Sequence, residues 1–427
     1  MLCMAKSEKA FICAMANYLG EILDKRLRSL VFTAFGHFSN DSMFLVYPLL
    51  ITYYALVPGV SIVLLGYLAV VYELIYGLLS FPIGRIADRM HDEGALIALG
   101  IFLLGLAMAA FAASFAFRAY MIGLILVGVL LLGSGTAFYH PMGASVLRKF
   151  YKSRAPTVMG VNGSFGSLGR SVMPIIIVLL VGYLGEAGAL SIVAAELFIS
   201  SLIIYVGLGF VNRKAAAVKE YVAKKAAATK HNIKRSNGYL MSLLPLLSII
   251  FVKAMFMAST TTFVPEYLLT GLHSELEVGG LLTFSFVFAI AGQLVFGYFT
   301  TRFGGRKVIA ATTTLSSIAF FFFLYGGDNV LIIGAAYAIF VFVTFNGFSV
   351  TLGYVGQAVP EEYINRANSF IWGFGQILGS AAGVLLFTLL LNFIKIDLAM
   401  WIMLAVAVAA VVMLPLLLVG NRGRKNL

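Results

Sequence analysis

Residues 212–238 read NRKAAAVKEYVAKKAAATKHNIKRSNG, the one long polar stretch in a chain of 427 residues. On each side of it lie six apolar blocks bounded by charged residues, glycine or proline. Blocks of roughly 18 to 28 apolar residues can each cross a hydrocarbon layer about 30 Å thick as a helix. The polar stretch therefore divides the chain into two halves of six predicted membrane helices.

The composition also indicates a membrane protein. Hydrophobic residues make up 61% of the chain and charged residues 11%, which leaves too few charges to cover a soluble surface. We expect an all-α membrane protein with twelve transmembrane helices in two pseudo-symmetric six-helix bundles. The predicted spans are residues 29–57, 61–84, 95–117, 120–147, 156–183, 187–211, 239–270, 278–301, 307–326, 330–358, 365–393 and 397–420.

The positions of the basic residues orient these spans. Of the 30 Lys and Arg, 26 fall in the termini and in the loops on one side, whereas the opposite side carries only Arg118 and Lys395. By the positive-inside rule both termini are predicted to be cytoplasmic, in a multi-pass protein of the plasma membrane. The net charge of +12 thus serves membrane orientation, and we exclude a nucleic-acid partner.

Five regions follow from this pattern: a cytoplasmic lead-in (1–28), a first bundle (29–211), a basic linker (212–238), a second bundle (239–420) and a cytoplasmic tail (421–427). The linker suits a helix on the anionic inner leaflet or a solvated tether equally well. Cys3 and Cys13 form neither a disulfide framework nor a metal quartet, so we predict no metal and no cofactor.

The two halves share an internal repeat. Equivalent loop residues recur at an offset of 212 or 213: Gly84 with Gly297, Arg89 with Arg302, and Arg154 with Arg366. Two parallel halves related by an axis along the membrane normal enclose a cavity at mid-membrane, and rocking them opens that cavity to alternate sides. The repeat therefore predicts a transporter that works by alternating access.

The loop Gly84-x3-Asp88-Arg89 and its second copy at 297–307 resemble the major facilitator superfamily, and the resemblance covers residues 29–420. It implies that Gly84, Asp88, Arg89, Arg302 and Arg306 latch the cytoplasmic side through helix ends and carboxylates. The second copy departs from the pattern because Thr301 stands where Asp88 maps.

Five further segments look like the fosmidomycin-resistance group of drug exporters: GHFSND at 36–41, YPLL at 47–50, YEL at 72–74, FYHP at 138–141 and NGSFGSLG at 162–169. The chain departs from that group at polar positions. It has Glu73 where the group has Gln, Met142 where it has Glu, and Arg170 where it has a small or neutral residue. The resemblance therefore implies the fold of that group. Because the departures lie at polar cavity positions, it does not imply the group's substrate.

Four ionisable residues fall near mid-depth in the predicted spans: Asp41, Glu73, Arg170 and Lys253. Each costs at least roughly 2.5 to 3.5 kcal/mol in the membrane, so each needs a partner, a wet cavity or a function. The family arrangement would put all four on helices that face the central cavity. Asp41 and Lys253 are 212 residues apart, which places them at equivalent positions in opposite halves.

We interpret Asp41 as the proton-coupling residue, with Glu73 and His37 assisting, because moving a carboxylate between a wet cavity and an occluded core changes its proton affinity. The alternative is a permanent ion pair of Asp41 with Lys253 or Arg170. Glu73 has the alternative of a neutral, hydrogen-bonded acid. Glu196, on a supporting span, is interpreted as structural.

Arg170 and Lys253 are the predicted anion-binding residues, with counter-ion duty toward the acids as the alternative. Other cavity positions offer hydrogen bonds or aromatic surface to a substrate: His140, Asn162, Tyr139, Gln293, Asn346 and Trp372. The glycines at 160–169 and 373–379 are interpreted as sites of close helix approach rather than phosphate binding, since they lie inside spans.

Together these features favour proton-coupled export of a small amphipathic or anionic compound by a monomeric carrier. Uptake of an organic anion is the alternative. An intramembrane enzyme is more distant, because no nucleophile motif accompanies His37, Asp41 and His140. A channel is disfavoured by mixed charge at the centre.

Overall fold

The computed structural model describes residues 25–90, 92–211, 241, 243–327, 329–359, 367–368 and 370–419. Within these residues the chain is helical and makes twelve crossings. The elements are the helix 25–42 continued by η1 (Met43–Leu45) and α2 (Val46–Ala55), then α3 (Ile62–Met90), α4 (Glu93–Ala116), η2 (Arg118–Tyr120), α5 (Met121–Tyr151), η3 (Lys152–Arg154), α6 (Ala155–Leu208), α9 (Leu244–Leu272), α10 (Glu275–Phe303), α11 (Gly305–Tyr325), α12 (Val330–Thr344), α13 (Gly347–Ala358), the π-helix η6 (Ile371–Ile377), α15 (Leu378–Leu390), α16 (Ile396–Val412) and α17 (Leu416–Val419).

Side-chain caps fix several helix ends. Asp92 accepts a hydrogen bond from Ala95 N at the start of α4, and Ser274 accepts one from Glu277 N at the start of α10. Asn329 accepts from Leu331 N and Ile332 N at the start of α12. Each cap satisfies backbone donors that the first turn leaves without a partner. The helices therefore begin close to the predicted boundaries.

α6 contains two crossings in one continuous helical element. Gly185 interrupts it with φ 69° and ψ 170°, a left-handed conformation that glycine adopts without strain. The predicted break between residues 183 and 187 lies at this turn. Three other crossings are irregular in ways the sequence did not indicate: η1 interrupts the first, α12 and α13 are separated at Asn346, and η6 is a seven-residue π-helix.

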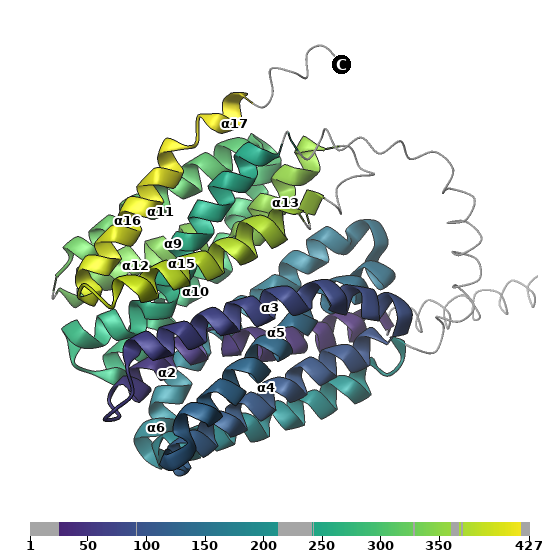
Figure 1. The fold of residues 1–427 in the computed structure, drawn as a ribbon. Coiled ribbons are helices and arrows are strands. Elements are labelled where there is room, and N and C mark those ends of the chain that lie inside the picture. Colours follow the sequence, from purple (N-terminus) through teal and green to yellow (C-terminus); the bar gives the residue numbers. More distant parts are fainter. Residues whose placement is uncertain are drawn as a thin grey trace, which may run out of the picture.

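The chain folds into two helical bundles, which lie one above the other in Figure 1. The first runs from residue 25 to α6, and the second from α9 to α17. We call the end of the bundles at residues 92, 152–154, 211 and 304 the linker side, and the end at residues 56–61, 117–120 and 185 the far side.

Helix contacts join the two bundles in three places. The first pairs α2 with α9, the second α3 with α15 and the adjoining η6, and the third α6 with α10. A Cβ added to Gly66 would lie 2.4 Å from Thr388 Oγ1, and one added to Gly279 would lie 2.8 Å from Val178 Cγ2. These glycines lie one turn from the far-side ends of their helices. The bundles are therefore closely packed against each other on the far side.

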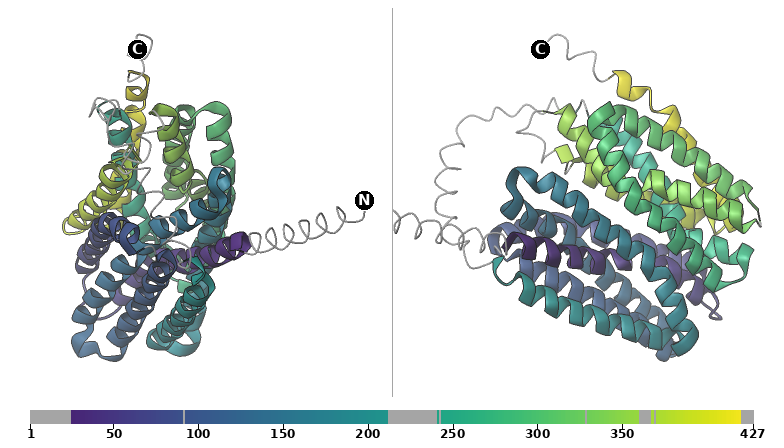
Figure 2. Two further views of the ribbon diagram at one scale, coloured as in Figure 1. Left: turned by 90° about the vertical axis from the view of Figure 1, so that its right-hand side faces the viewer. Right: turned by 180° about the vertical axis from the view of Figure 1, so that it is seen from behind.

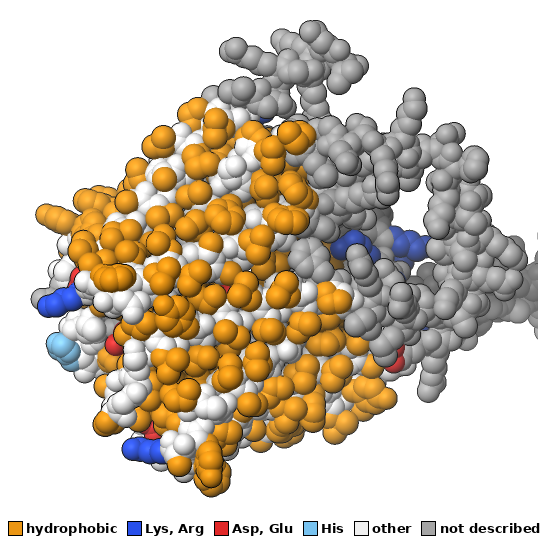
Figure 3. Space-filling view, in the orientation of Figure 1, with side chains coloured by type: hydrophobic (Ala, Val, Ile, Leu, Met, Phe, Trp, Pro, Cys, Tyr) orange, Lys and Arg blue, Asp and Glu red, His pale blue; other side chains and the backbone are white. Residues whose placement is uncertain are grey.

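An apolar belt surrounds both bundles. Among the described residues, eight helices are long and apolar enough to cross a membrane, and α6 is long enough to do so twice. In Figure 3 hydrophobic side chains cover the middle of the visible face, with charged side chains gathered toward its ends. The chain is an integral, multi-pass membrane protein.

Candidate functional site

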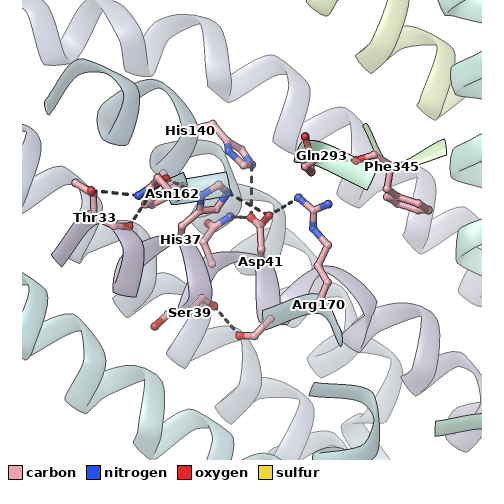
Figure 4. Close-up of polar contacts among 12 residues, drawn as sticks. Thr33, His37, Ser39, Asp41, His140, Asn162, Arg170, Gln293 and Phe345 are labelled. Carbon is pink, nitrogen blue, oxygen red and sulfur yellow. Dashed lines mark hydrogen bonds and ion pairs between the residues drawn. The ribbon is translucent and has the colours of Figure 1, made fainter. Parts of the chain in front are cut away.

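A buried ion pair lies within the first bundle. Asp41 stands near the end of the helix 25–42, and only 4% of its side chain is exposed. Arg170 Nη2 from α6 donates to Asp41 Oδ2, as Figure 4 shows. The sequence left open whether Asp41 pairs with Lys253 or with Arg170. In the structure its partner is Arg170, from the same bundle.

Two histidines adjoin the same carboxylate. His37, one turn earlier on the same helix, places Nε2 3.3 Å from Asp41 Oδ2. His140, from α5, places Nε2 3.7 Å from Asp41 Oδ1. The His37 and His140 rings meet edge to face with centroids 5.4 Å apart. One carboxylate thus faces one guanidinium and two imidazoles.

Asn162 of α6 orients His37. Its Oδ1 accepts from His37 Nδ1 at 2.7 Å, and its Nδ2 donates to Thr33 Oγ1 at 3.2 Å. Tyr139 of α5 stacks on His37 at 4.6 Å between centroids, and its hydroxyl lies 2.7 Å from Thr33 O and 2.9 Å from Asn162 Oδ1. The predicted residues Asn162, Tyr139 and His37 form one hydrogen-bonded group.

This orientation of the Asn162 amide has a chemical consequence for His37. A carbonyl oxygen only accepts, so His37 Nδ1 carries a hydrogen and Nε2 is the atom turned toward Asp41. Two lone pairs facing each other across 3.3 Å would repel. His37 Nε2 and Asp41 Oδ2 are therefore two proton-accepting atoms 3.3 Å apart, beside the Arg170 guanidinium.

Glycines of α6 make this contact between helices possible. A Cβ on Gly166 would lie 2.5 Å from His37 Nε2 and 2.7 Å from Asp41 Oδ2. A Cβ on Gly169 would lie 2.4 Å from the backbone oxygen of Phe38. The interpretation of this glycine run as a site of close helix approach is confirmed at these two positions.

Arg170 uses little of its hydrogen-bonding capacity. One nitrogen donates to Asp41, and Nε is buried without a partner among the described residues. The guanidinium carbon lies 5.1 Å from the centroid of the Phe44 ring. That ring contacts Phe345 of the second bundle at 5.9 Å. Arg170 therefore lies where the two bundles meet, and among the described residues Asp41 is the side chain to which it donates a hydrogen bond.

Two predicted ionisable residues lie outside this network. Glu73 of α3 and Lys253 of α9 are each partly buried, and neither forms an ion pair within the part of the chain that the structure describes. The equivalence of Asp41 and Lys253 in the repeat does not bring them into contact. Opposite bundles carry them, whereas Arg170 reaches Asp41 from a neighbouring helix.

The second bundle supplies the remaining predicted residues. Gln293 of α10 lies across from Arg170 in Figure 4, and its Nε2 donates to Phe345 O at 2.7 Å. Asn346 is fully buried and donates to Val343 O at 2.7 Å, where the α12 crossing is interrupted. Trp372 lies on the π-helix η6. Of these three, Gln293 is the one seen beside the ion pair.

The predicted cytoplasmic latch is described only in part. Gly84, Asp88 and Arg89 belong to the last turns of α3, but their side chains lie outside the described residues. Arg302 Nη1 donates to Tyr298 Oη at 2.7 Å on its own helix. Neither Arg302 nor Arg306 forms an ion pair within the described part of the chain. The latch role stays a prediction.

Other polar contacts on the linker side were missed from the sequence. Glu93, 3% exposed at the start of α4, pairs with Lys149 of α5 and accepts from Ser145 Oγ at 3.0 Å. In the second bundle Gln357 Oε1 accepts from Gly305 N at 2.9 Å. Glu93 directly follows Asp92, the cap of α4, and this position was the sequence signal that could have indicated its contact with Lys149.

Two further carboxylates lie within the crossings. Glu196 of α6 accepts from Ser200 Oγ at 2.5 Å, one turn away on the same helix, in agreement with a structural role. Glu266 of α9 was overlooked because it lies near the end of its predicted span. Its Oε2 is buried without a partner among the described residues.

His37, Asp41 and His140 are close enough to share a metal ion, with ligand atoms within 4.8 Å of one another. The donor types suit a borderline transition metal. However, Arg170 already binds the same carboxylate, and its positive charge opposes a dication. The residues present therefore fit a proton better than a metal.

Known proteins are similar to this chain in sequence and in fold. The family model for the Major Facilitator Superfamily matches residues 30–273 and 246–426. The Escherichia coli fosmidomycin resistance protein is 26% identical over 82% of this chain and 83% of its own. The uncharacterised transporter YfnC of Bacillus subtilis is 23% identical over 84% of this chain and 86% of its own.

Solved structures agree on the fold. A POT family transporter crystallised with 5-aminolevulinic acid superposes with a TM-score of 0.73 at 14% identity, over 92% of this chain and 96% of its own. A peptide transporter crystallised with alafosfalin gives a TM-score of 0.68 at 16% identity, over 91% and 93%. The twelve crossings and the sequence match together show that the chain belongs to the major facilitator superfamily and is a membrane transporter.

Proposed function

We propose that this protein is a secondary active transporter of the plasma membrane that couples proton movement to export of a small amphipathic or anionic compound. It works as a monomer with both termini cytoplasmic, carries no cofactor and catalyses no reaction. The observation that carries the proposal is the Asp41–Arg170 ion pair with His37 and His140 against the same carboxylate. Similarity to the fosmidomycin resistance protein supports export of a drug-like compound.

The coupling follows from competition at Asp41. For export, the compound binds Arg170 while the ionised Asp41 holds the guanidinium in place. A proton that then binds Asp41 breaks this pair and releases the compound, so proton and compound bind in turn. His37 offers a second place for that proton 3.3 Å away. The proposed machinery also includes Glu73 and Lys253, and it includes the cytoplasmic gate residues Gly84, Asp88, Arg89, Arg302 and Arg306. The close packing on the far side supports a state open toward the linker side in the alternating cycle.

The substrate side of the site rests on Arg170. A guanidinium that spends one donor on Asp41 can grip a carboxylate or phosphate with its remaining edge. Gln293 lies opposite on the second bundle, so a compound held by Arg170 would also contact the other half. His140, Asn162, Tyr139, Asn346, Trp372 and Lys253 remain proposed substrate contacts around it.

Uptake of an organic anion is the second candidate, and the same ion pair favours it. An anion that takes Arg170 leaves Asp41 without its cation, and the carboxylate then gains a proton. Anion and proton would in that case bind together and move in the same direction. The direction of proton flux during transport separates the two candidates.

Purified protein in liposomes tests the proposal. With a pH gradient imposed, wild type should accumulate substrate, and Asp41→Asn should transport without responding to the gradient. Arg170→Ala should weaken binding of anionic compounds. Glu196→Gln is the matched control, because that acid bonds within its own helix and should leave coupling intact. Full gradient-driven transport by Asp41→Asn would refute the coupling role.

A further inference from the structure

A groove runs between the first and sixth crossings of the first bundle, on the linker side. It has a volume of about 370 Å³, and six residues line it: Arg28, Phe32, Leu202, Ile203, Val206 and Gly207. Figure 2, seen from behind, shows the N-terminal helix running beside the last part of α6. The groove opens outward, away from the Asp41 site, which lies on the inner side of these helices.

The walls of the groove are apolar and face the hydrocarbon. Leu202 is 64% exposed and Val206 66%, values that place these side chains toward lipid in a membrane protein. At the floor of the groove the Phe32 ring packs directly on Gly207. A Cβ added to Gly207 would lie 2.3 Å from that ring. An extended hydrocarbon chain suits such a wall because it buries apolar surface on both helices.

A positive charge stands at one end of the groove. Arg28 lies near the start of the described part of this helix, with Nη2 3.5 Å from Gly207 O and its guanidinium carbon 4.8 Å from the centroid of the Phe210 ring. These contacts hold the charge beside the last turn of α6, where the apolar part of both helices ends. In the sequence just before it Glu21 and Asp24 balance Lys25 and Arg26, so Arg28 supplies the net positive charge of residues 21–28.

We propose that this groove binds one anionic phospholipid of the linker-side leaflet. Its phosphate would accept hydrogen bonds from Arg28, and one acyl chain would lie along Phe32, Ile203 and Val206. The charge selects an anionic headgroup over a zwitterionic one, and the apolar walls supply affinity for the chain. The lipid is bound independently of the transported substrate.

Native mass spectrometry of the full-length protein tests this assignment. Protein in detergent is incubated with equal amounts of phosphatidylglycerol and phosphatidylcholine of matched chains. One Arg near the membrane surface is worth about a fivefold preference for the anionic lipid. Arg28→Gln should abolish that preference, Arg28→Lys should retain most of it, and Val206→Trp should reduce binding of both lipids by filling the groove.

Two variants control for general effects. Arg118→Gln removes an exposed arginine on the far side, and Ile199→Trp adds the same bulk to an exposed position of α6 outside the groove. Both should bind lipid as wild type does. Equal binding of the two lipids by wild type, an unchanged preference in Arg28→Gln, or equal losses in the controls would each overturn the proposal. So would displacement of the lipid by a transported substrate, which would assign the groove to substrate entry.

Discussion

The Asp41–Arg170 pair predicts a strongly non-additive response to mutation. The side chains are 4% and 15% exposed, so neither charge is well solvated when its partner is removed. Removing one member of such a pair costs about 3–5 kcal/mol because the other stays buried and uncompensated. Asp41→Asn and Arg170→Gln should each destabilise the protein by that amount. The double variant leaves two neutral groups and should lose less than either single variant.

Reversible unfolding in mixed detergent micelles, followed by circular dichroism, measures the four free energies of the cycle. The expected coupling energy exceeds about 3 kcal/mol, well above the 0.3–0.5 kcal/mol scatter of independent sites. Arg118→Gln, an exposed charge on the far side, should change stability by less than about 0.5 kcal/mol. If the double variant lost the sum of the two single losses, the pair would not be a buried ion pair of the kind described.

The packing also predicts how stability changes when glycines of α6 or Glu93 are substituted. Gly169→Ala puts a Cβ 2.4 Å from the Phe38 backbone oxygen and should cost about 1–3 kcal/mol in the same unfolding assay, whereas Gly163→Ala, with nothing within 4 Å, should be neutral or stabilising. Equal effects would contradict the close approach. Glu93→Gln should cost about 1 kcal/mol, because Lys149 is 40% exposed and solvent screens the pair; a loss above 3 kcal/mol would show a deeper role.

Much of the site could be predicted because intramembrane charge is rare and expensive. The spacing of His37 and Asp41 put both on one helix face, and the cavity-facing spans brought Arg170, His140 and Asn162 into consideration. The choice between Arg170 and Lys253 needed the packing. Glycines on α6 bring its backbone against the first helix, and this close approach places Arg170 beside Asp41. The repeat offset between Asp41 and Lys253 contains no information about that distance.

Other features depended on local context that a hydropathy pattern does not contain. Glu93 follows a loop of charged residues, so its burial arises only once Lys149 of α5 stands opposite. Glu266 lies near a predicted boundary, where a shift of a few residues decides between loop and membrane. The π-helix η6 depends on one extra residue per turn, and its sequence, IWGFGQI with two glycines, fits an α-helix equally well.

That π-helix divides the eleventh crossing into two parts with different helical phase. α15 is fastened to α9 where Gly379 and Gly383 meet the backbone oxygens of Phe251 and Met255. Shifting the π-helix to α-helical bonding would displace the register by one residue and turn everything before Ile371 by about 100°. The π-helix therefore sets how Ala367 and Phe370 are oriented about the helix axis, without changing how α15 packs on α9.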